Sequence, residues 1–301
     1  MSSKHPVISV TGSSGAGTTS IKRAFEGLFE QLGIANPAIV EGDSFHRYER
    51  AEMRRRIEEA QRRGEHFSHF SIEANLLENL EALFREYGET GRGKRRYYIH
   101  DHAESLLRGG IKPGCFTPWE EIPPGTDLLF YEGLHGAVCT DRVNIPRYAD
   151  LIVGVAPIVN LEWIQKIHRD TAERGYKPRD VTDTILRRMY DYIHVITPQF
   201  SRTDINFQRV PTVDTSNPFV AREIPAPDES FVIVRFNNPN KFRVDFTSLL
   251  ASISRSFMSR HNSIVIPGSE LQYAMEIIFQ PILEQMMRVI YQIKSSKESW
   301  Y

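Results

Sequence analysis

The sequence predicts an α/β fold of three layers, in which a largely parallel, mixed β-sheet carries helices on both faces. Apolar runs at 128–131 and 151–155 are nearly continuous, as expected for parallel strands that are buried on both faces. Helical patterns follow such runs, and a glycine-rich loop joins the first apolar run to the first helical pattern. No linker or repeat divides the chain, so we expect one domain over residues 1–301.

The first half of the chain alternates between strand and helix patterns. We expect strands at 7–11, 37–41 and 127–133 and helices at 21–32, 50–63 and 72–87. The last of these helices is amphipathic, because Leu76, Leu80 and Leu83 recur at helical spacing. Residues 96–100 have an extended pattern, and the Gly and Pro residues of 109–125 indicate a loop.

The second half adds the remaining strands and three helices. We expect strands at 151–155, 230–236 and 262–266 and helices at 160–174, 182–196 and 269–294. Residues 199–218 are polar and are predicted to be irregular.

A glycine-rich loop after the first strand matches the phosphate-binding P-loop, G-x-x-x-x-G-K-[ST], except at one position. Its glycines let backbone N–H groups converge on an anion, and the next helix N-terminus adds partial positive charge. The residues predicted to bind nucleotide phosphates are Gly12, Ser13, Ser14, Gly15, Ala16, Gly17, Thr18 and Thr19. Thr19 is also the candidate Mg²⁺ contact, and Thr18 replaces the motif's lysine. The alternative is an ordinary Gly/Ser turn; the glycine order disfavours a dinucleotide fingerprint.

Two acids follow strands whose carboxyl ends meet at the same sheet edge as the loop. Glu132 ends an apolar strand, as a Mg²⁺-binding carboxylate of a nucleotide site does, although a strand can also simply end in a polar residue. Asp43 follows the second strand and is the candidate general base, with a helix N-cap as the alternative.

Cationic residues follow Asp43 closely. His46, Arg50 and Arg54 suit an acceptor that itself carries a phosphate, whereas Arg55 and Arg56 are better explained by a solvated charged helix. Further along, we interpret Tyr98 and His100 as acceptor-site donors. The pattern His100-Asp101-His102 is weak evidence for a metal site, because no partner ligands accompany it.

The helix at 160–174 carries a second charged group. Lys166, Arg169, Asp170 and Arg174 share one side of it. A surface helix with paired charges explains them on their own. Because the loop lacks its lysine, we favour a lid that closes over the phosphates and restores the missing positive charge.

Composition excludes several classes of partner. The 301 residues carry a net charge of −1, so we expect neither nucleic acid nor a membrane as a partner. No apolar stretch approaches transmembrane length, and residues 1–6 lack the core of a signal peptide, so we expect a cytoplasmic protein. Cys115 and Cys139 have neither a disulfide framework nor metal-ligand spacing.

Taken together, these motifs resemble the phosphoribulokinases, and in particular their shorter bacterial type. The segments that carry the resemblance span nearly the whole chain and are GSSGAGTT (12–19), EGDSFHR (41–47), FYEGLHGAV (130–138), NLEWIQKIHRDTAERG (160–175) and TDINFQRVPTVDTSNPF (203–219). Bacterial members also have threonine in place of the loop lysine, which accounts for Thr18. The resemblance implies a P-loop kinase-type domain with a lid helix at about 160–180 and a C-terminal helix at about 269–294.

The resemblance further implies an activity and the residues that carry it. The activity is ATP-dependent phosphorylation of D-ribulose 5-phosphate at O1 to give ribulose 1,5-bisphosphate in the Calvin cycle, with Mg²⁺ accompanying ATP. Asp43 matches the base, and Glu132 and Asp170 match acids near Mg²⁺–ATP. The lid cations by this likeness are Lys166, Arg169 and Arg174, and the acceptor-binding residues are His46, Arg50, Arg54, Tyr98 and His100.

Regulation is implied only by the same likeness. It suggests a homo-oligomer, typically an octamer, that NADH activates and AMP inhibits. Arg188, Arg235 and Arg260 are candidate effector contacts, with ordinary surface arginines as the alternative. The P-loop has no cysteine, so redox control of the plant type is not expected. Lys177 and Arg179 depart from the family pattern of Ser/Thr and Glu, which leaves the charge of the lid open.

Two other functions remain as alternatives. A pyrimidine nucleoside kinase is one, because the R-D-x-x-x-R-G pattern at 169–175 resembles the lid of that relative as well. Its acceptor carries no phosphate and has no need of the basic patch after Asp43. The other is a catalytically silent nucleotide-binding regulator, suggested by the missing lysine but disfavoured because base, metal acid and lid cations are all present.

Overall fold

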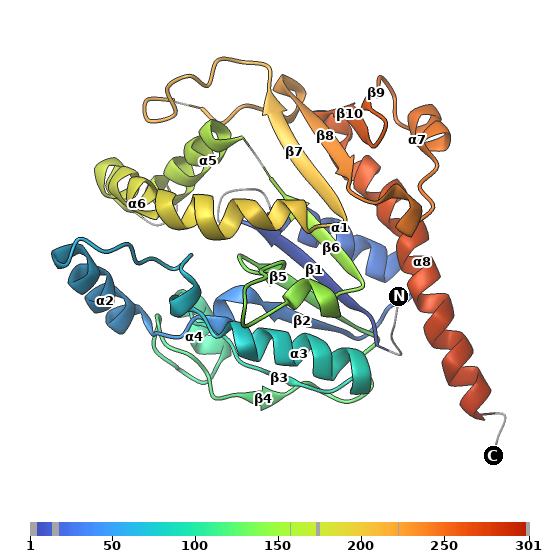
Figure 1. The fold of residues 1–301 in the computed structure, drawn as a ribbon, viewed down its shortest axis with the longest axis horizontal. Helices are drawn as coiled ribbons and strands as arrows, with labels where there is room; N and C mark the ends of the chain where they lie inside the picture. The colour runs from blue at the N-terminus through green and yellow to red at the C-terminus, as the bar shows by residue number, and fades with distance from the viewer. Residues whose placement is uncertain (1–4, 14–17, 157, 173–174, 222, 299–301) are drawn as a thin grey trace.

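The fold is given by a computed structural model, which describes residues 5–13, 18–156, 158–172, 175–221 and 223–298, with the side chains of Thr19 and of 289–298 left out (Figure 1). Within these residues an eight-stranded sheet has the order β2-β5-β1-β6-β7-β8-β10-β9. The strands are β1 (Val7–Gly12), β2 (Pro37–Glu41), β5 (Leu128–Gly133), β6 (Leu151–Val155), β7 (Ile205–Pro211), β8 (Ser230–Phe236), β9 (Phe257–Arg260) and β10 (Ser263–Pro267).

The sheet is parallel on one side and antiparallel on the other. Strands β2, β5, β1, β6 and β7 pair in parallel, and β8, β10 and β9 continue the sheet with antiparallel pairs. A largely parallel, mixed sheet is therefore confirmed.

Helices cover both faces of the sheet and bury alternate residues of its central strands. On one face, α1 (Thr18–Gln31) packs beside α8 (Leu271–Glu298), and the ring of Phe25 lies 5.1 Å from that of Phe130 in β5. On the other face, α3 (Leu77–Thr90) shares a buried cluster with Leu129 and Tyr131 of the same strand. Strand β5 is apolar at consecutive positions because each face meets a helical layer.

The remaining elements lie around this core. They are α2 (Arg50–Arg62), α4 (His102–Leu107), α5 (Val159–Ala172), α6 (Pro178–Asp191), α7 (Phe246–Ser252) and the short pair β3 (Lys94–Arg95) and β4 (Glu120–Glu121). Figure 1 shows α2, α5 and α6 on the side of the molecule opposite the C-terminal end of α8. Helices α5 and α6 pack on each other.

Several expectations about the elements need correction. The segment 199–218, predicted to be irregular, contains β7, which pairs with both β6 and β8. The expected loop at 109–125 contains β4, and the helix expected at 182–196 ends at Asp191, where a π-helical turn, Tyr192–Ile196, follows. The helix expected from 72 begins with a 3-10 turn at Ile72–Ala74 and becomes α-helical at Leu77.

Candidate active site

The carboxyl ends of the parallel strands carry the predicted site. Glu132 of β5 pairs with Val10 of β1 on one side and with Glu41 of β2 on the other, so the three strands end at the same level of the sheet. The P-loop leaves β1 here, the 3-10 turn Gly42–Phe45 leaves β2, and α5 begins soon after β6. This edge is where ligands of open α/β sheets bind.

The described part of the P-loop is tightly packed. A Cβ on Gly12 would lie 2.9 Å from the carbonyl oxygen of Val155, so only glycine fits there. Ser13 is buried, and its hydroxyl donates to the carboxylate of Glu162 in α5; the Tyr192 hydroxyl donates to the same carboxylate at 2.9 Å. The other predicted phosphate contacts, Ser14, Gly15, Ala16 and Gly17, and the side chain of Thr19, lie outside the described residues.

Glu132 stands on β5 with a cation near it. Burial raises its pKa, and a hydrogen bond with the Thr18 side chain and the charge of Lys22 offset this only in part. The Lys22 ammonium lies 3.4 Å from Glu41 Oε1, at the end of the neighbouring strand β2. Lys22 was not predicted, and it places a positive charge on the first helix after the P-loop.

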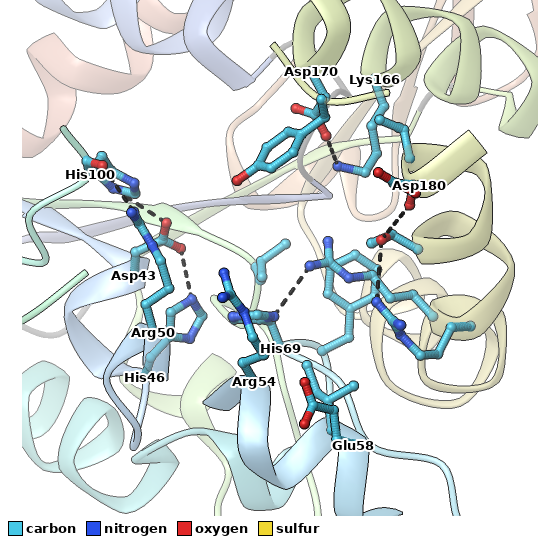
Figure 2. A pocket seen from close by; sticks show the side chains of 18 of the residues that line it. Asp43, His46, Arg50, Arg54, Glu58, His69, His100, Lys166, Asp170 and Asp180 are labelled. Atoms are coloured by element: carbon cyan, nitrogen blue, oxygen red, sulfur yellow. Dashed lines mark hydrogen bonds and ion pairs between the residues drawn. The ribbon is translucent and has the colours of Figure 1, made fainter. Parts of the chain in front are cut away.

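A cavity of about 640 Å³ brings together the predicted base, the predicted acceptor-site residues and two residues of the predicted lid helix (Figure 2). The predicted residues that line it are Asp43, His46, Arg50, Arg54, Tyr98, His100, Lys166 and Asp170. We call the turn after β2, helix α2 and residues 98–100 the acceptor wall, and helices α5 and α6 the lid wall. Figure 2 shows Asp43, His46 and His100 together on the acceptor wall and Lys166 and Asp170 on the lid wall.

Asp43 is held between two imidazole rings. Its Oδ1 lies 3.2 Å from Nε2 of His46, and its Oδ2 lies 3.5 Å from Nε2 of His100. Burial alone would raise the pKa of this carboxyl, but His46, His100 and His69 together outweigh burial and hold the pKa well below its usual range. The carboxylate is therefore ionised and able to accept a proton at any pH near neutrality.

Arg50 ties the acceptor wall together. Its Nε donates to the Tyr98 hydroxyl at 3.3 Å, and its Nη2 donates to the carbonyl oxygen of His100 at 2.9 Å. Burial raises the pKa of Tyr98, and the nearby Arg50 opposes this in part. The guanidinium of Arg50 thus holds helix α2 and residues 98–100 together beside the cavity. Asp101, next to His100, caps α4 by accepting from the backbone N–H of Glu104, which accounts for it without a metal.

The lid wall carries a compact charge cluster. The Lys166 ammonium lies 2.5 Å from Asp170 Oδ2, and Arg169 donates to Asp170 Oδ1 from Nη2 at 3.1 Å. Burial and the nearby Arg188 lower the pKa of Lys166 to about 8, although Asp170 acts in the opposite direction. Lys166 and Asp170 line the cavity, whereas Arg169 is not among its lining residues. Arg174 lies outside the described residues, and Lys177 and Arg179 are exposed at the start of α6.

Two groups on the walls of the cavity differ from the sequence-based expectations, because His69 was not predicted and Arg188 was named only as a candidate effector contact. His69, in the loop before α3, accepts a hydrogen bond at Nδ1 from Nη2 of Arg188 in α6 at 3.2 Å. Burial, then Arg187, lowers the pKa of Arg188 to about 10. Describing Arg188 as an ordinary surface arginine is therefore wrong, whereas Arg235 and Arg260 are exposed on β8 and β9. No periodic pattern marks His69; only its place in a His- and Phe-rich loop could have signalled it.

Among the residues with described placement, no group of three or more His, Cys, Asp or Glu side chains forms a metal cage. Mg²⁺ at nucleotide sites takes one or two carboxylates and completes its shell with phosphate oxygens and water, so it needs no such cage. Across the same residues, no helix is both long enough and apolar enough to cross a bilayer.

Comparisons with known proteins agree with this geometry. The family model described as the phosphoribulokinase/uridine kinase family matches residues 7–216. A phosphoribulokinase of Nitrobacter vulgaris is 61% identical over 94% of this chain and 97% of its own length. The chromosomal phosphoribulokinase of Cupriavidus necator is 57% identical, covering 95% and 97%. The solved structure of phosphoribulokinase from Rhodobacter spheroides matches with a TM-score of 0.86 at 53% identity, over 95% of this chain and 99% of that one.

Proposed function

The chain belongs to the phosphoribulokinase/uridine kinase family, and we propose that it transfers the γ-phosphoryl group of ATP to O1 of D-ribulose 5-phosphate, giving D-ribulose 1,5-bisphosphate. This is the step of the Calvin cycle that makes the acceptor for carbon fixation. One observation carries the choice of acceptor: His46, Arg50, Arg54 and Arg188 line the same cavity as Asp43. Such cationic lining suits a substrate that already bears a phosphate.

Asp43 is the proposed proton acceptor. Its carboxylate takes the proton of the O1 hydroxyl as that oxygen bonds to the γ-phosphorus and the bond from phosphorus to the leaving oxygen of ADP breaks. The low pKa of Asp43 makes it a weak base. A weak base suffices because phosphoryl transfer passes through a loose transition state, in which the attacking hydroxyl needs to lose its proton only late.

Lys166 and Arg169 are the proposed source of the charge that the P-loop lacks. Both reach Asp170 from the same helix, so a small movement of α5 would carry them together. Charge on the transferring phosphoryl group is what such cations stabilise. With Thr18 in place of the loop lysine, backbone amides of the P-loop would bind the phosphates, and the lid residues would supply the positive charge for catalysis.

Mg²⁺ bound with ATP would neutralise phosphate charge, and Thr19, Glu132 and Asp170 are the residues we propose to hold it. Glu132 supports this choice, because burial raises its pKa and a cation beside it would restore the ionised form. Asp170 also supports this choice, because it lines the cavity and its carboxylate already pairs with the two cations Lys166 and Arg169.

The acceptor decides between this proposal and its rivals. ADP release would be measured in a coupled assay with ribulose 5-phosphate, with ribulose and with uridine as matched acceptors. We expect turnover with ribulose 5-phosphate alone. Preferred turnover of uridine would favour a pyrimidine nucleoside kinase. If none of the three acceptors supports ADP release, a catalytically silent nucleotide-binding regulator would be favoured.

We also infer a cytoplasmic homo-oligomer, octameric by likeness to bacterial members, with NADH as activator. The exposed Arg235 and Arg260 are available for effector binding, whereas Arg188 faces the cavity. Size-exclusion chromatography with light scattering would measure the oligomer, and initial rates with and without NADH would test activation.

A further inference from the structure

Asn75 has only one sensible orientation in the structure. Its Nδ2 donates to two backbone carbonyl oxygens, that of His69 at 3.0 Å and that of Ser71 at 2.7 Å. Rotating the amide by 180° would set its oxygen against both carbonyls. The amide oxygen is therefore fixed toward His46, whose Nδ1 lies 2.7 Å away.

The orientation of the Asn75 amide determines which ring nitrogens of His46 are protonated. Because the amide oxygen can only accept, Nδ1 must carry a hydrogen. The other ring nitrogen, Nε2, faces the Asp43 carboxylate at 3.2 Å and also points to an acceptor. His46 is 7% exposed, so little of it is open to water that would compete with these partners. Two acceptors on two ring nitrogens favour the doubly protonated imidazolium.

The backbone fixes Asn75 and His46 at this distance. The two residues form an isolated antiparallel bridge, Leu76 N–H donates to the carbonyl of Phe45 at 2.7 Å, and Arg47 N–H donates to that of Ala74 at 2.8 Å. The contact between the amide and the imidazole is thus built into the fold and does not depend on a flexible side chain.

Other charged and titratable groups face His46 from the elements around it. They are Asp43 from its own turn, His69, Tyr98, His135 and, from α6, Arg188. Burial and Arg188 lower the pKa of His46, but Asp43 and Asn75 prevail and the pKa is raised. The neighbouring His69 behaves in the opposite way: burial and the charge of Arg188 lower its pKa, and its Nδ1 accepts a hydrogen bond from Arg188, as a neutral ring can.

We propose that Asn75 is a positioning residue of the phosphoryl transfer, which holds His46 as the imidazolium partner of Asp43. Its importance for turnover rests on the proposed function, whereas its effect on the His46 ring does not. An imidazolium at this place keeps Asp43 ionised, adds a positive charge for the acceptor phosphate, and prevents Asp43 from turning away from the cavity.

The test is a pH titration of His46 by nitrogen NMR on the full chain with ¹⁵N-labelled histidine, assigned with His46→Gln. In the wild type we expect both ring nitrogens to remain protonated to a pH above the ordinary midpoint of about 6.5. In Asn75→Leu, which keeps the side-chain volume and removes the acceptor, the midpoint should fall by about one unit, the scale of one hydrogen bond to a charged group. An unchanged midpoint in the folded variant overturns the proposal.

Asn206→Leu is the matched control. Asn206 is also a buried amide whose Nδ2 donates to a backbone carbonyl, that of Phe200 at 2.7 Å, but it lies on β7. Its loss should lower stability and leave the His46 midpoint unchanged. An equal midpoint shift in this control would mean that general loosening of the fold is responsible, and would overturn the role of Asn75.

A second variant covers the case in which Asn75→Leu does not fold. In Asn75→Asp an oxygen still faces His46 and now carries negative charge, so the midpoint of the His46 titration should rise; a fall would overturn the proposal.

Kinetic measurements separate the role of Asn75 from the proposed function. For Asn75→Leu, kcat/KM for ribulose 5-phosphate should fall more at pH 8 than at pH 6. A midpoint shift in a protein whose wild type does not phosphorylate ribulose 5-phosphate supports the Asn75 assignment and refutes the proposed function.

Discussion

The two walls of the cavity are held in different ways. On the acceptor wall, partners from distant segments hold two of the side chains: Asn75 holds His46, and the Tyr98 hydroxyl holds Arg50. On the lid wall, Lys166 and Arg169 both reach Asp170 within α5 itself. We therefore expect the acceptor wall to be preorganised for its ligand, whereas Lys166 and Arg169 share one partner, Asp170, on their own helix and would move together with α5.

The largest effect should come from Asp43, the proposed base on the acceptor wall. Asp43→Asn keeps the shape of the side chain and removes its ability to accept a proton, so kcat should fall roughly 10²–10⁴-fold. ATP binding should be retained, because the P-loop is untouched. Coupled ADP release and nucleotide titration measure the two quantities, with the exposed Asp228→Asn as control. A kcat close to that of the wild type would contradict the assignment of the base.

Next comes the lid wall. Lys166→Met removes a cation and leaves the acceptor wall intact, so kcat should fall on the order of 10³-fold with little change in the KM for ribulose 5-phosphate. Steady-state kinetics with each substrate varied in turn separate the two parameters. A raised KM with an unchanged kcat would instead assign Lys166 to acceptor binding and would remove the distinction between the walls.

A smaller effect should follow from disturbing the preorganised wall while keeping its charge. In Arg50→Lys the ammonium cannot reach both the Tyr98 hydroxyl and the His100 carbonyl, so the KM for ribulose 5-phosphate should rise roughly tenfold. Arg55→Lys is the matched control on the same helix, since Arg55 is exposed and pairs only with Glu52 and Glu59 among the described contacts. Equal effects of both variants would show that charge alone matters.

The smallest effect concerns stability and its pH dependence. The pKa of Asp43 is lowered in the fold, so its contribution is present above about pH 4 and is lost as pH falls further. The pKa of His46 is raised, so its contribution is complete below about pH 6.5 and is lost as pH rises through the folded value. The Tm difference between wild type and Asp43→Asn should thus be largest between these limits and narrow toward pH 9. A difference that stays constant with pH would argue against the pairing.

Local patterns in the sequence were sufficient to predict much of the fold and of the candidate site. The P-loop glycines, the apolar strands β1, β5 and β6, and the amphipathic α3 each depend on neighbours in the chain. Residues next to strand ends, such as Asp43, could be assigned to one edge because parallel strands end together.

What the sequence did not reveal depends on tertiary packing. Strand β7 was missed because only its first residues are fully buried, and Gln208 and Arg209 mask its alternation. His69 and Arg188 meet only because a loop and α6 fold over one cavity, and the role of Asn75 depends on two carbonyl oxygens that orient its amide. None of these relations leaves a periodic signal.

We expect the acceptor wall to be fully formed before the lid wall closes over ATP. Isothermal titration of ribulose 5-phosphate into the nucleotide-free protein tests it most directly. We predict binding with an affinity within a few-fold of that measured in the presence of a non-hydrolysable ATP analogue. Binding that is detectable only when the nucleotide analogue is present would contradict the claim, because the acceptor wall would then be assembled by closure of the lid.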